Sequence, residues 1–98
     1  MLDGLRVVEM GSYVVIPKAA RMLADWGAEV IKVDSPRGDY WRHYARDLDL
    51  PCNDEGNVLF QSENVNKRCI ALDLKQSEGL EVLFKLLETA DVFMCNLR

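Results

Sequence analysis

The stretch that decides the fold, residues 64–96, reads NVNKRCIALDLKQSEGLEVLFKLLETADVFMCN. Within it, residues 69–74 are predicted to form a short strand, residues 77–88 an amphipathic helix, and residues 92–95 a fully apolar strand. A strand, a helix and a strand in this order form a crossover unit with parallel strands. Ligands of such sheets bind beyond the carboxyl ends of the strands. We therefore expect binding chemistry at the carboxyl ends of these two strands, in residues 72–75 and 96–98.

The helix predicted inside this stretch has one apolar face. Its large apolar side chains recur at the spacing i, i+3, i+4, i+7 and are Leu80, Leu83, Phe84 and Leu87. Ser77 is predicted to cap the N-terminus, where the carboxylates of Glu78 and Glu81 favour the positive end of the helix dipole.

A second unit of the same kind precedes this stretch. Residues 5–10 are predicted to form a strand that Gly11 ends, and Pro17 suits the first turn of a helix. Gly27 ends that helix, and a strand over residues 30–33 follows. The buried helix face is predicted from the same spacing and consists of Ala19, Met22, Leu23 and Trp26.

Residues 35–57 break the pattern. They contain two prolines and two glycines, charges of both signs and three aromatic residues, with no sustained period. An irregular connection of this length is usually functional or disordered, so we expect these residues to be mobile. A helical turn is predicted directly after them, over residues 58–63.

These elements predict one small α/β domain with an open parallel sheet of about four strands, built from βαβ units. Two helices cannot cover both faces of such a sheet well. We therefore expect the sequence to be the incomplete N-terminal part of a larger domain. The alternative is a small domain that completes its core by dimerising.

The composition disfavours several classes of partner. The 98 residues carry a net charge of −4 with a pI of about 4.9, whereas binding to nucleic acid or to an anionic membrane requires a basic face. No apolar run approaches the ~20 residues that span a bilayer, and the N-terminus does not resemble a signal peptide. The three cysteines fit neither a disulfide framework nor a zinc site, which favours a reducing cytoplasm. Cys69 and Cys95, within strands, are predicted to be buried.

Two kinds of catalytic or cofactor site are weakly supported. Gly11 and, 23 residues later, Asp34 end the first two strands, as in a dinucleotide site, but the glycine-rich turn that would meet a pyrophosphate is missing. His43 is favoured as a solvated loop residue, and no metal-ligand constellation is present. Three further carboxylates are favoured as turn formers or strand ends: Glu9, Asp73 and Asp91.

A site for a phosphorylated ligand at the strand ends has more support. Lys75 follows a predicted strand, and its ammonium is a point charge suited to a phosphate. Asn96 offers an amide to a polar ring or to a pantetheine-like amide. Taken singly, each is compatible with an ordinary surface position. Together at one sheet edge they favour a phosphorylated cofactor, and further positive charge comes from Arg37, Arg42 and Arg46.

Four ordered blocks of sequence resemble the class III CoA-transferases, the family of formyl-CoA transferase, carnitine CoA-transferase and α-methylacyl-CoA racemase. The blocks cover nearly the whole chain. Residues 64–67 and 96–98 look most like the branch that acts on aryl-lactates and other 2-hydroxy acids. The blocks are LDGLRVVE (2–9), LADWGAEVIKV (23–33) followed by PRGD (36–39), NKRCIALDLK (66–75) and ADVFMCN (90–96).

The resemblance implies an enzyme that moves CoA from an acyl-CoA to a free carboxylic acid. In this family an aspartate nucleophile forms mixed-anhydride and aspartyl-CoA intermediates. It also implies a Rossmann-like large domain and a small domain in an interlocked homodimer, with CoA as substrate and no metal. The CoA contacts that carry over are Tyr13, Val14, Val15, Ser35, Leu72, Asp73, Leu74, Lys75, Asn96, Leu97 and Arg98.

The sequence also departs from the family pattern. The family's nucleophilic aspartate lies beyond Arg98, so we assign no catalytic residue here and expect the chain alone to be inactive. Val15 and Ile16 replace small residues and are expected to narrow the acyl or pantetheine channel. Ser35 replaces an arginine of some members, and Leu97 replaces a common aromatic residue. The alternatives are the racemase-like branch, a dinucleotide-binding domain of an oxidoreductase, and a non-enzymatic self-associating domain.

Overall fold

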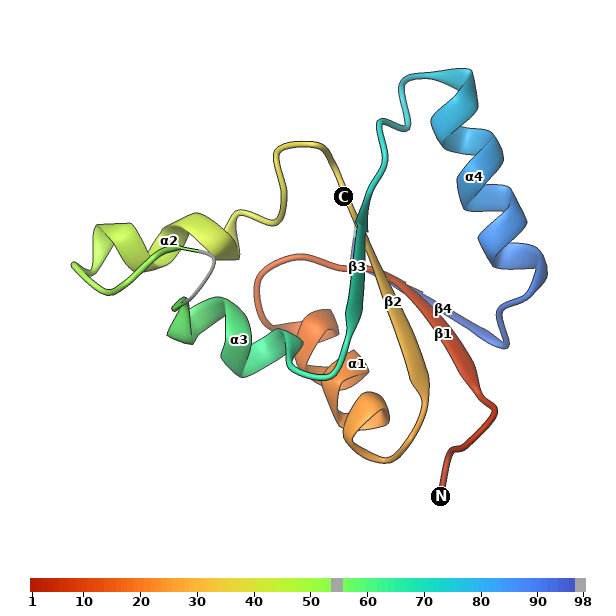
Figure 1. The fold of residues 1–98 in the computed structure, drawn as a ribbon, viewed down its shortest axis with the longest axis horizontal. Coiled ribbons are helices and arrows are strands. Elements are labelled where there is room, and N and C mark those ends of the chain that lie inside the picture. The colour runs from red at the N-terminus through yellow and green to blue at the C-terminus, as the bar shows by residue number, and fades with distance from the viewer. Residues whose placement is uncertain (54–55, 97–98) are drawn as a thin grey trace.

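The computed structural model describes residues 1–53 and 56–96. Two strand–helix–strand segments are present, as predicted, and two further helices lie between them in sequence (Figure 1). In chain order the elements are β1 (Arg6–Met10), α1 (Val15–Asp25), β2 (Glu29–Asp34), α2 (Trp41–Asp47), α3 (Val58–Asn64), β3 (Arg68–Ala71), α4 (Ser77–Glu88) and β4 (Val92–Cys95).

The strands of the described part of the chain form one parallel sheet in the order β3-β2-β1-β4. Val8 of β1 lies opposite Ile31 of β2 on one side and Phe93 of β4 on the other. The predicted open parallel sheet is confirmed. Since all strands run the same way, their carboxyl ends meet at one edge, where the two predicted binding segments begin.

Each face of the sheet is packed against one helix. Successive side chains of a strand point to opposite faces, so Val7 and Val8 belong to different clusters. Val7 and Val30 pack with the alanines of α1, whereas Val8 and Val33 pack with Leu83 of α4. α1 therefore covers one face and α4 the other.

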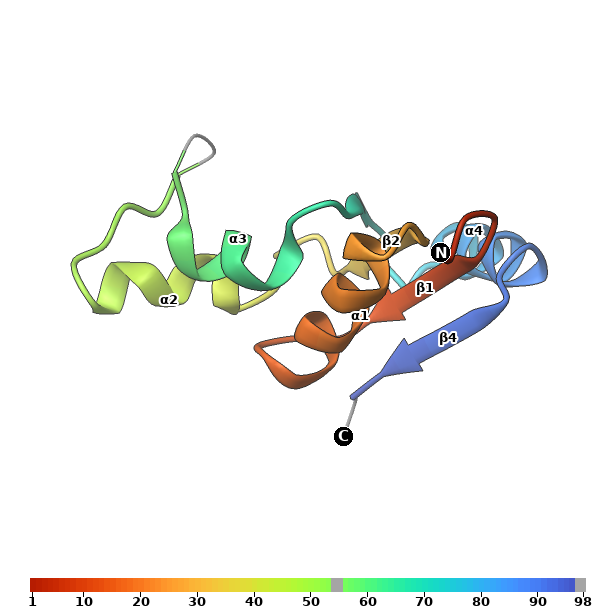
Figure 2. The ribbon, with the colours of Figure 1, turned by 90° about the horizontal axis from the view of Figure 1, so that it is seen from below.

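Residues 35–57 are more regular than predicted, because they contain α2. The short helices α2 and α3 pack against each other beside the sheet (Figures 1 and 2). They lie on the opposite side of the molecule from α4. Arg42 lies over the ring of Phe60, with 3.8 Å from its guanidinium carbon to the ring centroid, and Trp41 Nε1 donates to the Leu59 carbonyl at 2.7 Å. A seven-residue helix shows less than two turns of periodicity, so the pattern could not reveal it. The turn predicted over residues 58–63 is confirmed as α3, whereas the mobility of residues 35–57 stays a prediction.

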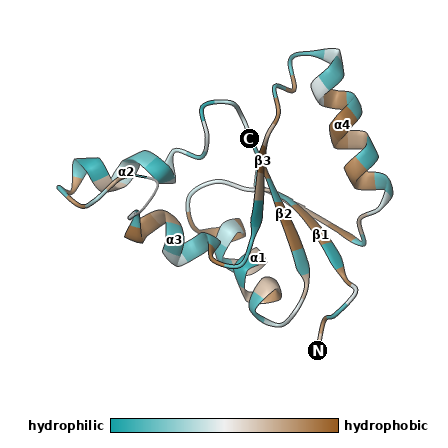
Figure 3. Cartoon of the chain, viewed as in Figure 1, coloured by the Kyte–Doolittle hydropathy of each residue, from teal (hydrophilic) through white to brown (hydrophobic). Residues whose placement is uncertain are grey.

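The two longer helices are less buried than their patterns predict. Trp26 is 50% exposed and Phe84 58%, and Met22 and Leu80 are also exposed, so the predicted buried faces are wrong at these four positions. The spacing identifies the side of a helix that meets the sheet but not the width of the surface it meets, and Figure 3 shows hydrophobic residues along much of α4. The predicted Ser77 cap is also wrong, because Ser77 is the first helical residue and Gln76 occupies the cap position without a side-chain hydrogen bond.

The prediction that Cys69 and Cys95 are buried is wrong as well. Both are exposed free thiols. They belong to β3 and β4, which are the two edge strands of the sheet. Among the described residues, no helix has the length and apolar character needed to cross a bilayer.

Candidate functional site

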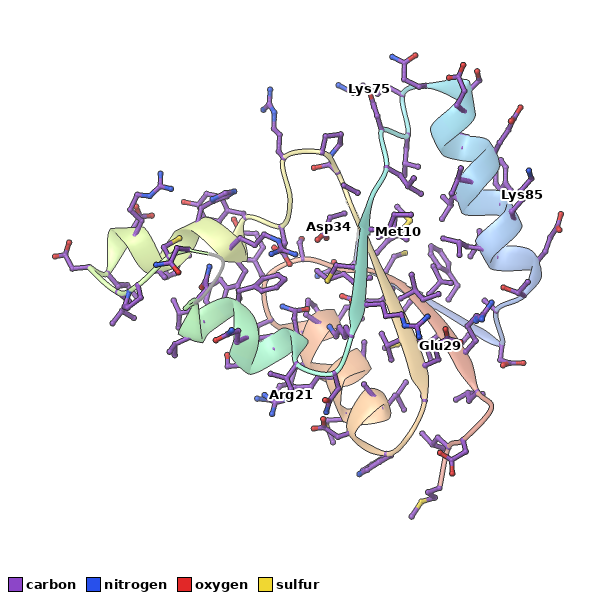
Figure 4. The ribbon with its side chains drawn as sticks, viewed as in Figure 1. Met10, Arg21, Glu29, Asp34, Lys75 and Lys85 are labelled. Atoms are coloured by element: carbon purple, nitrogen blue, oxygen red, sulfur yellow. The ribbon has the colours of Figure 1, made fainter. Side chains whose placement is uncertain are left out.

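A cavity of about 470 Å³ opens at the carboxyl ends of β1, β2 and β3. Figure 4 shows Asp34 and Lys75 toward this edge of the sheet and Glu29 at the opposite end of β2. Six of the eleven residues predicted to contact CoA line the cavity together: Tyr13, Ser35, Leu72, Asp73, Leu74 and Lys75.

Three of the other predicted contacts, Val14, Val15 and Asn96, lie outside this cavity lining. Val15, the first residue of α1, is 75% exposed, and Val14 precedes it. The Asn96 amide is engaged with Ser12, accepting from its backbone N–H at 3.0 Å and donating to its carbonyl at 3.1 Å. This pair fastens the end of β4 to the segment after β1. Leu97 and Arg98 lie outside the described residues.

The wall that follows β1 depends on side chains that pack closely against the Gly11 backbone. A Cβ on Gly11 would lie 2.8 Å from Cβ of Ile16 and 2.9 Å from Oε1 of Glu9, so this position accepts only glycine without a shift. Tyr13 then takes the left-handed conformation, with φ of 65°. Non-glycine residues persist in that region only where their surroundings hold them.

The wall that follows β3 is shaped by its backbone contacts. Leu72 donates to the Asp34 carbonyl at 2.9 Å, which extends the pairing of β3 with β2 beyond the strand. The Asp73 carboxylate accepts from the backbone N–H of Lys75 at 3.1 Å. This turn leads into α4 and leaves the Lys75 side chain exposed beside the cavity.

Ion pairs buried beneath the cavity join the strand ends to the segment after β2. Glu9 and Lys32 face each other in the register of β1 and β2, and both side chains are 0% exposed. Lys32 Nζ lies 3.3 Å from Glu9 Oε1, 3.5 Å from Asp34 Oδ1 and 3.1 Å from Asp39 Oδ2, and it donates to the Gly11 carbonyl at 2.7 Å. One ammonium therefore connects the ends of two strands and both segments that follow them.

A second buried ammonium completes the charge balance around Glu9. Lys67 Nζ lies 3.1 Å from Glu9 Oε2 and also donates to the Pro17 carbonyl and to Asn64 Oδ1, both at 2.8 Å. Glu9 thus bridges Lys32 and Lys67. Buried charges are tolerated where they are paired and hydrogen-bonded, as Glu9, Lys32 and Lys67 are.

Burial and neighbouring charge move the pKa values of this cluster in different directions. Burial alone would lower the pKa of Lys32, but the carboxylates of Glu9, Asp34 and Asp39 outweigh it, so the pKa is raised. Burial dominates at Lys67 and lowers its pKa despite the attraction of Glu9. Burial also raises the pKa of Asp34 against the opposing effect of Lys32.

Aromatic rings form the remaining side of the site. Tyr13 and Tyr40 both line the cavity, with ring centroids 5.4 Å apart. Behind them, Trp41 and Tyr44 stack at 5.0 Å with an interplanar angle of 12°, and Tyr13 contacts Trp41 at 6.0 Å. The segment expected to be irregular therefore supplies an aromatic cluster to the site.

Sequence reasoning missed Lys32, Asp39 and Lys67, and treated Glu9 as a strand end. One signal was available: a charged residue stands between two apolar residues inside each of the first two strands, Glu9 in RVVEM and Lys32 in EVIKVD. A period-2 pattern places both charges on the buried α1 face, where they have to pair with each other. No comparable signal in the sequence marks Asp39 or Lys67, because their partners come from distant segments.

Comparison with known proteins gives a consistent result. The family model of CoA-transferase family III matches residues 2–98. The chain is 43% identical over 98 residues to the (R)-2-hydroxy-4-methylpentanoate CoA-transferase of Clostridioides difficile, covering 100% of this chain and 25% of that protein. It is 40% identical over 98 residues to the cinnamoyl-CoA:phenyllactate CoA-transferase of Clostridium sporogenes, covering 100% of this chain and 24% of that protein.

Solved structures agree with the fold. The crystal structure of a CAIB/BAIF family protein from Brucella suis matches with a TM-score of 0.89 and 36% identity, covering 98% of this chain and 25% of that one. The chain thus spans about a quarter of the length of the relatives it matches.

Proposed function

Because the chain belongs to CoA-transferase family III, we propose that it forms the CoA-binding part of an enzyme that moves CoA from an acyl-CoA to a free carboxylic acid. The observation that carries this proposal is the strand-end cavity. It gathers Tyr13, Ser35 and residues 72–75, which are distant in sequence and were assigned to CoA by resemblance. Strand ends of parallel sheets are also where ligands generally bind.

The cavity offers chemistry that suits the two ends of CoA. Met10, Val33 and Leu72 provide apolar surface for a pantetheine chain, and the exposed ammonium of Lys75 provides charge for a phosphate. The neighbouring hollow beyond Asp34 adds two guanidinium groups, from Arg37 and Arg42. We propose that the phosphates lie toward Lys75 and these arginines, with pantetheine in the 470 Å³ cavity.

We propose a 2-hydroxy acid as the acceptor, on the strength of the names of two relatives, which act on (R)-2-hydroxy-4-methylpentanoate and phenyllactate. The racemase-like branch of the family is the runner-up. The dinucleotide alternative loses support because Asp34, the carboxylate that would accept from a ribose hydroxyl, is already paired with two cations. Asp34 lies 3.5 Å from Lys32 and 3.9 Å from Arg42.

We propose that transfer passes through mixed-anhydride and aspartyl-CoA intermediates, as the family resemblance implies, on an aspartate outside these 98 residues. The aspartates nearest the cavity have structural tasks: Asp34 and Asp39 are paired with Lys32, and Asp73 holds the turn before α4. We therefore expect these 98 residues alone to catalyse no transfer, which a thioester-exchange assay of the pure chain checks.

We also propose an interlocked homodimer, which the resemblance implies, and a cytoplasmic location, which the cysteine pattern favours. Apolar side chains that a partner surface would cover lie on α4 and β4, where Val82, Phe84 and Phe93 are exposed.

The test is a titration of the isotopically labelled chain with CoA, followed by amide NMR. We expect shifts concentrated at Tyr13, Ser35 and residues 72–75, and weaker binding by Lys75→Ala. Lys85→Ala is the matched control, because Lys85 lies further along α4 (Figure 4) and outside the cavity lining, and it should leave binding unchanged. A folded chain that shows no shifts at millimolar CoA, or equal losses in both variants, would overturn the assignment of this cavity.

A further inference from the structure

The Asp39 carboxylate joins the buried ion pairs to the wall of the cavity. Its Oδ1 accepts from the backbone N–H of Tyr13 at 3.2 Å and from that of Trp41 at 3.0 Å. Its Oδ2 lies 3.1 Å from Lys32 Nζ. Asp39 is only 3% exposed although it lines the cavity, so its hydrogen bonds compete little with water.

Lys32 pairs with Asp39 as well as with Glu9 and Asp34, and Asp39 is the nearest of the three carboxylates. Its ammonium is fully buried and also donates to the Gly11 carbonyl, two residues before Tyr13. The segment after β1 is therefore bound at two points: Asp39 accepts from the Tyr13 N–H, and Lys32 donates to the Gly11 carbonyl. Both contacts connect that segment to β2 and to the residues that follow it.

We propose that Lys32 and Asp39 are positioning residues, which hold Tyr13 in its left-handed conformation and thereby set the shape and the CoA affinity of the strand-end cavity. The claim about CoA affinity rests on the proposed function. The claim that Lys32 and Asp39 hold the conformation of Tyr13 does not depend on any ligand. The ring centroid of Tyr13 lies 5.4 Å from that of Tyr40 and 6.0 Å from that of Trp41. By holding the Tyr13 backbone, the Asp39 carboxylate therefore also fixes the packing of these rings.

A tyrosine at φ 65° has no local reason to stay there. An ordinary backbone conformation at residue 13 would redirect its side chain and the chain after it, where α1 begins at Val15. The charged acceptor on the Tyr13 N–H opposes that change, since hydrogen bonds to ionised groups are the stronger ones. Loss of the Asp39 carboxylate should therefore let Tyr13 leave its left-handed conformation, whereas loss of an unrelated buried carboxylate should not.

The test compares three variants. Asp39→Ala removes the acceptor, and Asp39→Asn keeps a carbonyl oxygen for the two N–H groups but loses the charge that pairs with Lys32. Glu63→Gln is the matched control, because Glu63 is a buried carboxylate paired with Lys18 at 3.6 Å and does not line the cavity. We expect CoA affinity to fall about tenfold or more for Asp39→Ala, less for Asp39→Asn, and not at all for Glu63→Gln.

Two readouts in the free protein separate positioning from general stability: the amide resonances and hydrogen exchange of Tyr13 and Trp41, and the near-ultraviolet circular dichroism of the aromatic cluster. Both should change in Asp39→Asn and stay as in the wild type in Glu63→Gln, even where the two variants lose similar thermal stability. If Asp39→Ala does not fold, the decision rests on Asp39→Asn.

The outcomes distinguish this inference from the function it builds on. A wild-type chain that does not bind CoA contradicts the proposed function, yet a changed Tyr13 amide and aromatic spectrum in Asp39→Asn would still support positioning. Wild-type spectra and wild-type CoA affinity in a folded Asp39→Asn chain would overturn the positioning role.

Discussion

Replacing Gly79 by alanine should destabilise the protein, although alanine has the higher helix propensity, because its side chain would clash with the backbone of Asp73. Gly79 lies in the first turn of α4, where alanine favours the helix by about 1 kcal/mol. A Cβ here would fall on the carbonyl oxygen of Asp73 and lie 2.8 Å from its carbonyl carbon. That obstacle is backbone and cannot rotate aside, so either α4 or residues 72–75 must move.

The balance of these two effects gives the expected magnitude. Overpacking costs about 1–3 kcal/mol, and a rigid backbone obstacle belongs at the upper end of that range. After subtraction of the gain in helix propensity, the free energy of unfolding should fall by about 2 kcal/mol. In a domain of this size, that corresponds to a drop in melting temperature of roughly 8–16 °C. CoA affinity should fall as well, because Asp73 lines the cavity.

Urea unfolding of the chain, followed by the fluorescence of Trp26 and Trp41, measures this change. Ser77→Ala is the control, since Ser77 is exposed in the same helical turn and its replacement tests helix propensity alone. We expect Ser77→Ala to change the free energy of unfolding by no more than about 0.5 kcal/mol. A Gly79→Ala chain as stable as the wild type, or more stable, would refute the close contact between α4 and Asp73.

Two further predictions concern the buried charges. Lys32→Met should lower the free energy of unfolding by about 3–5 kcal/mol, because it leaves the buried Asp39 carboxylate without its cation and removes one cation from Glu9 and Asp34. Urea unfolding checks this against the exposed Lys85→Met, and a loss below about 1 kcal/mol would contradict the pairing. The second prediction concerns pH. Burial raises the pKa of Asp34 above its unfolded value, so the folded chain takes up this proton first and the wild type should gain stability over Asp34→Asn as pH falls from 7 toward the unfolded pKa. Unfolding of both chains between pH 7 and 4 measures the difference in their free energies of unfolding. A difference that stays constant, or a wild type that loses stability relative to Asp34→Asn as pH falls, would contradict the raised pKa.

The part of the site that could be predicted from sequence depends on strand ends. The sequence predicts parallel strands over 69–74 and 92–95, so their carboxyl ends must meet at one edge. Chain order alone then places Lys75 at that edge, although β3 itself ends at Ala71. Asp39 could not be placed in this way, because it follows no strand directly and its partner Tyr13 is 26 residues away. Its role depends on how the segment after β2 folds back over β1.

The sequence by itself determined the architecture of this protein. Apolar periodicity and the order of elements were sufficient for a parallel α/β sheet, because strand alternation and helical spacing are local properties of the chain. The tertiary structure alone decided which charges are buried, that residues 41–47 form α2 and supply rings to the aromatic cluster, and that a side chain at Gly79 would clash with Asp73. These features arise from contacts between distant segments, so no window of sequence contains both partners.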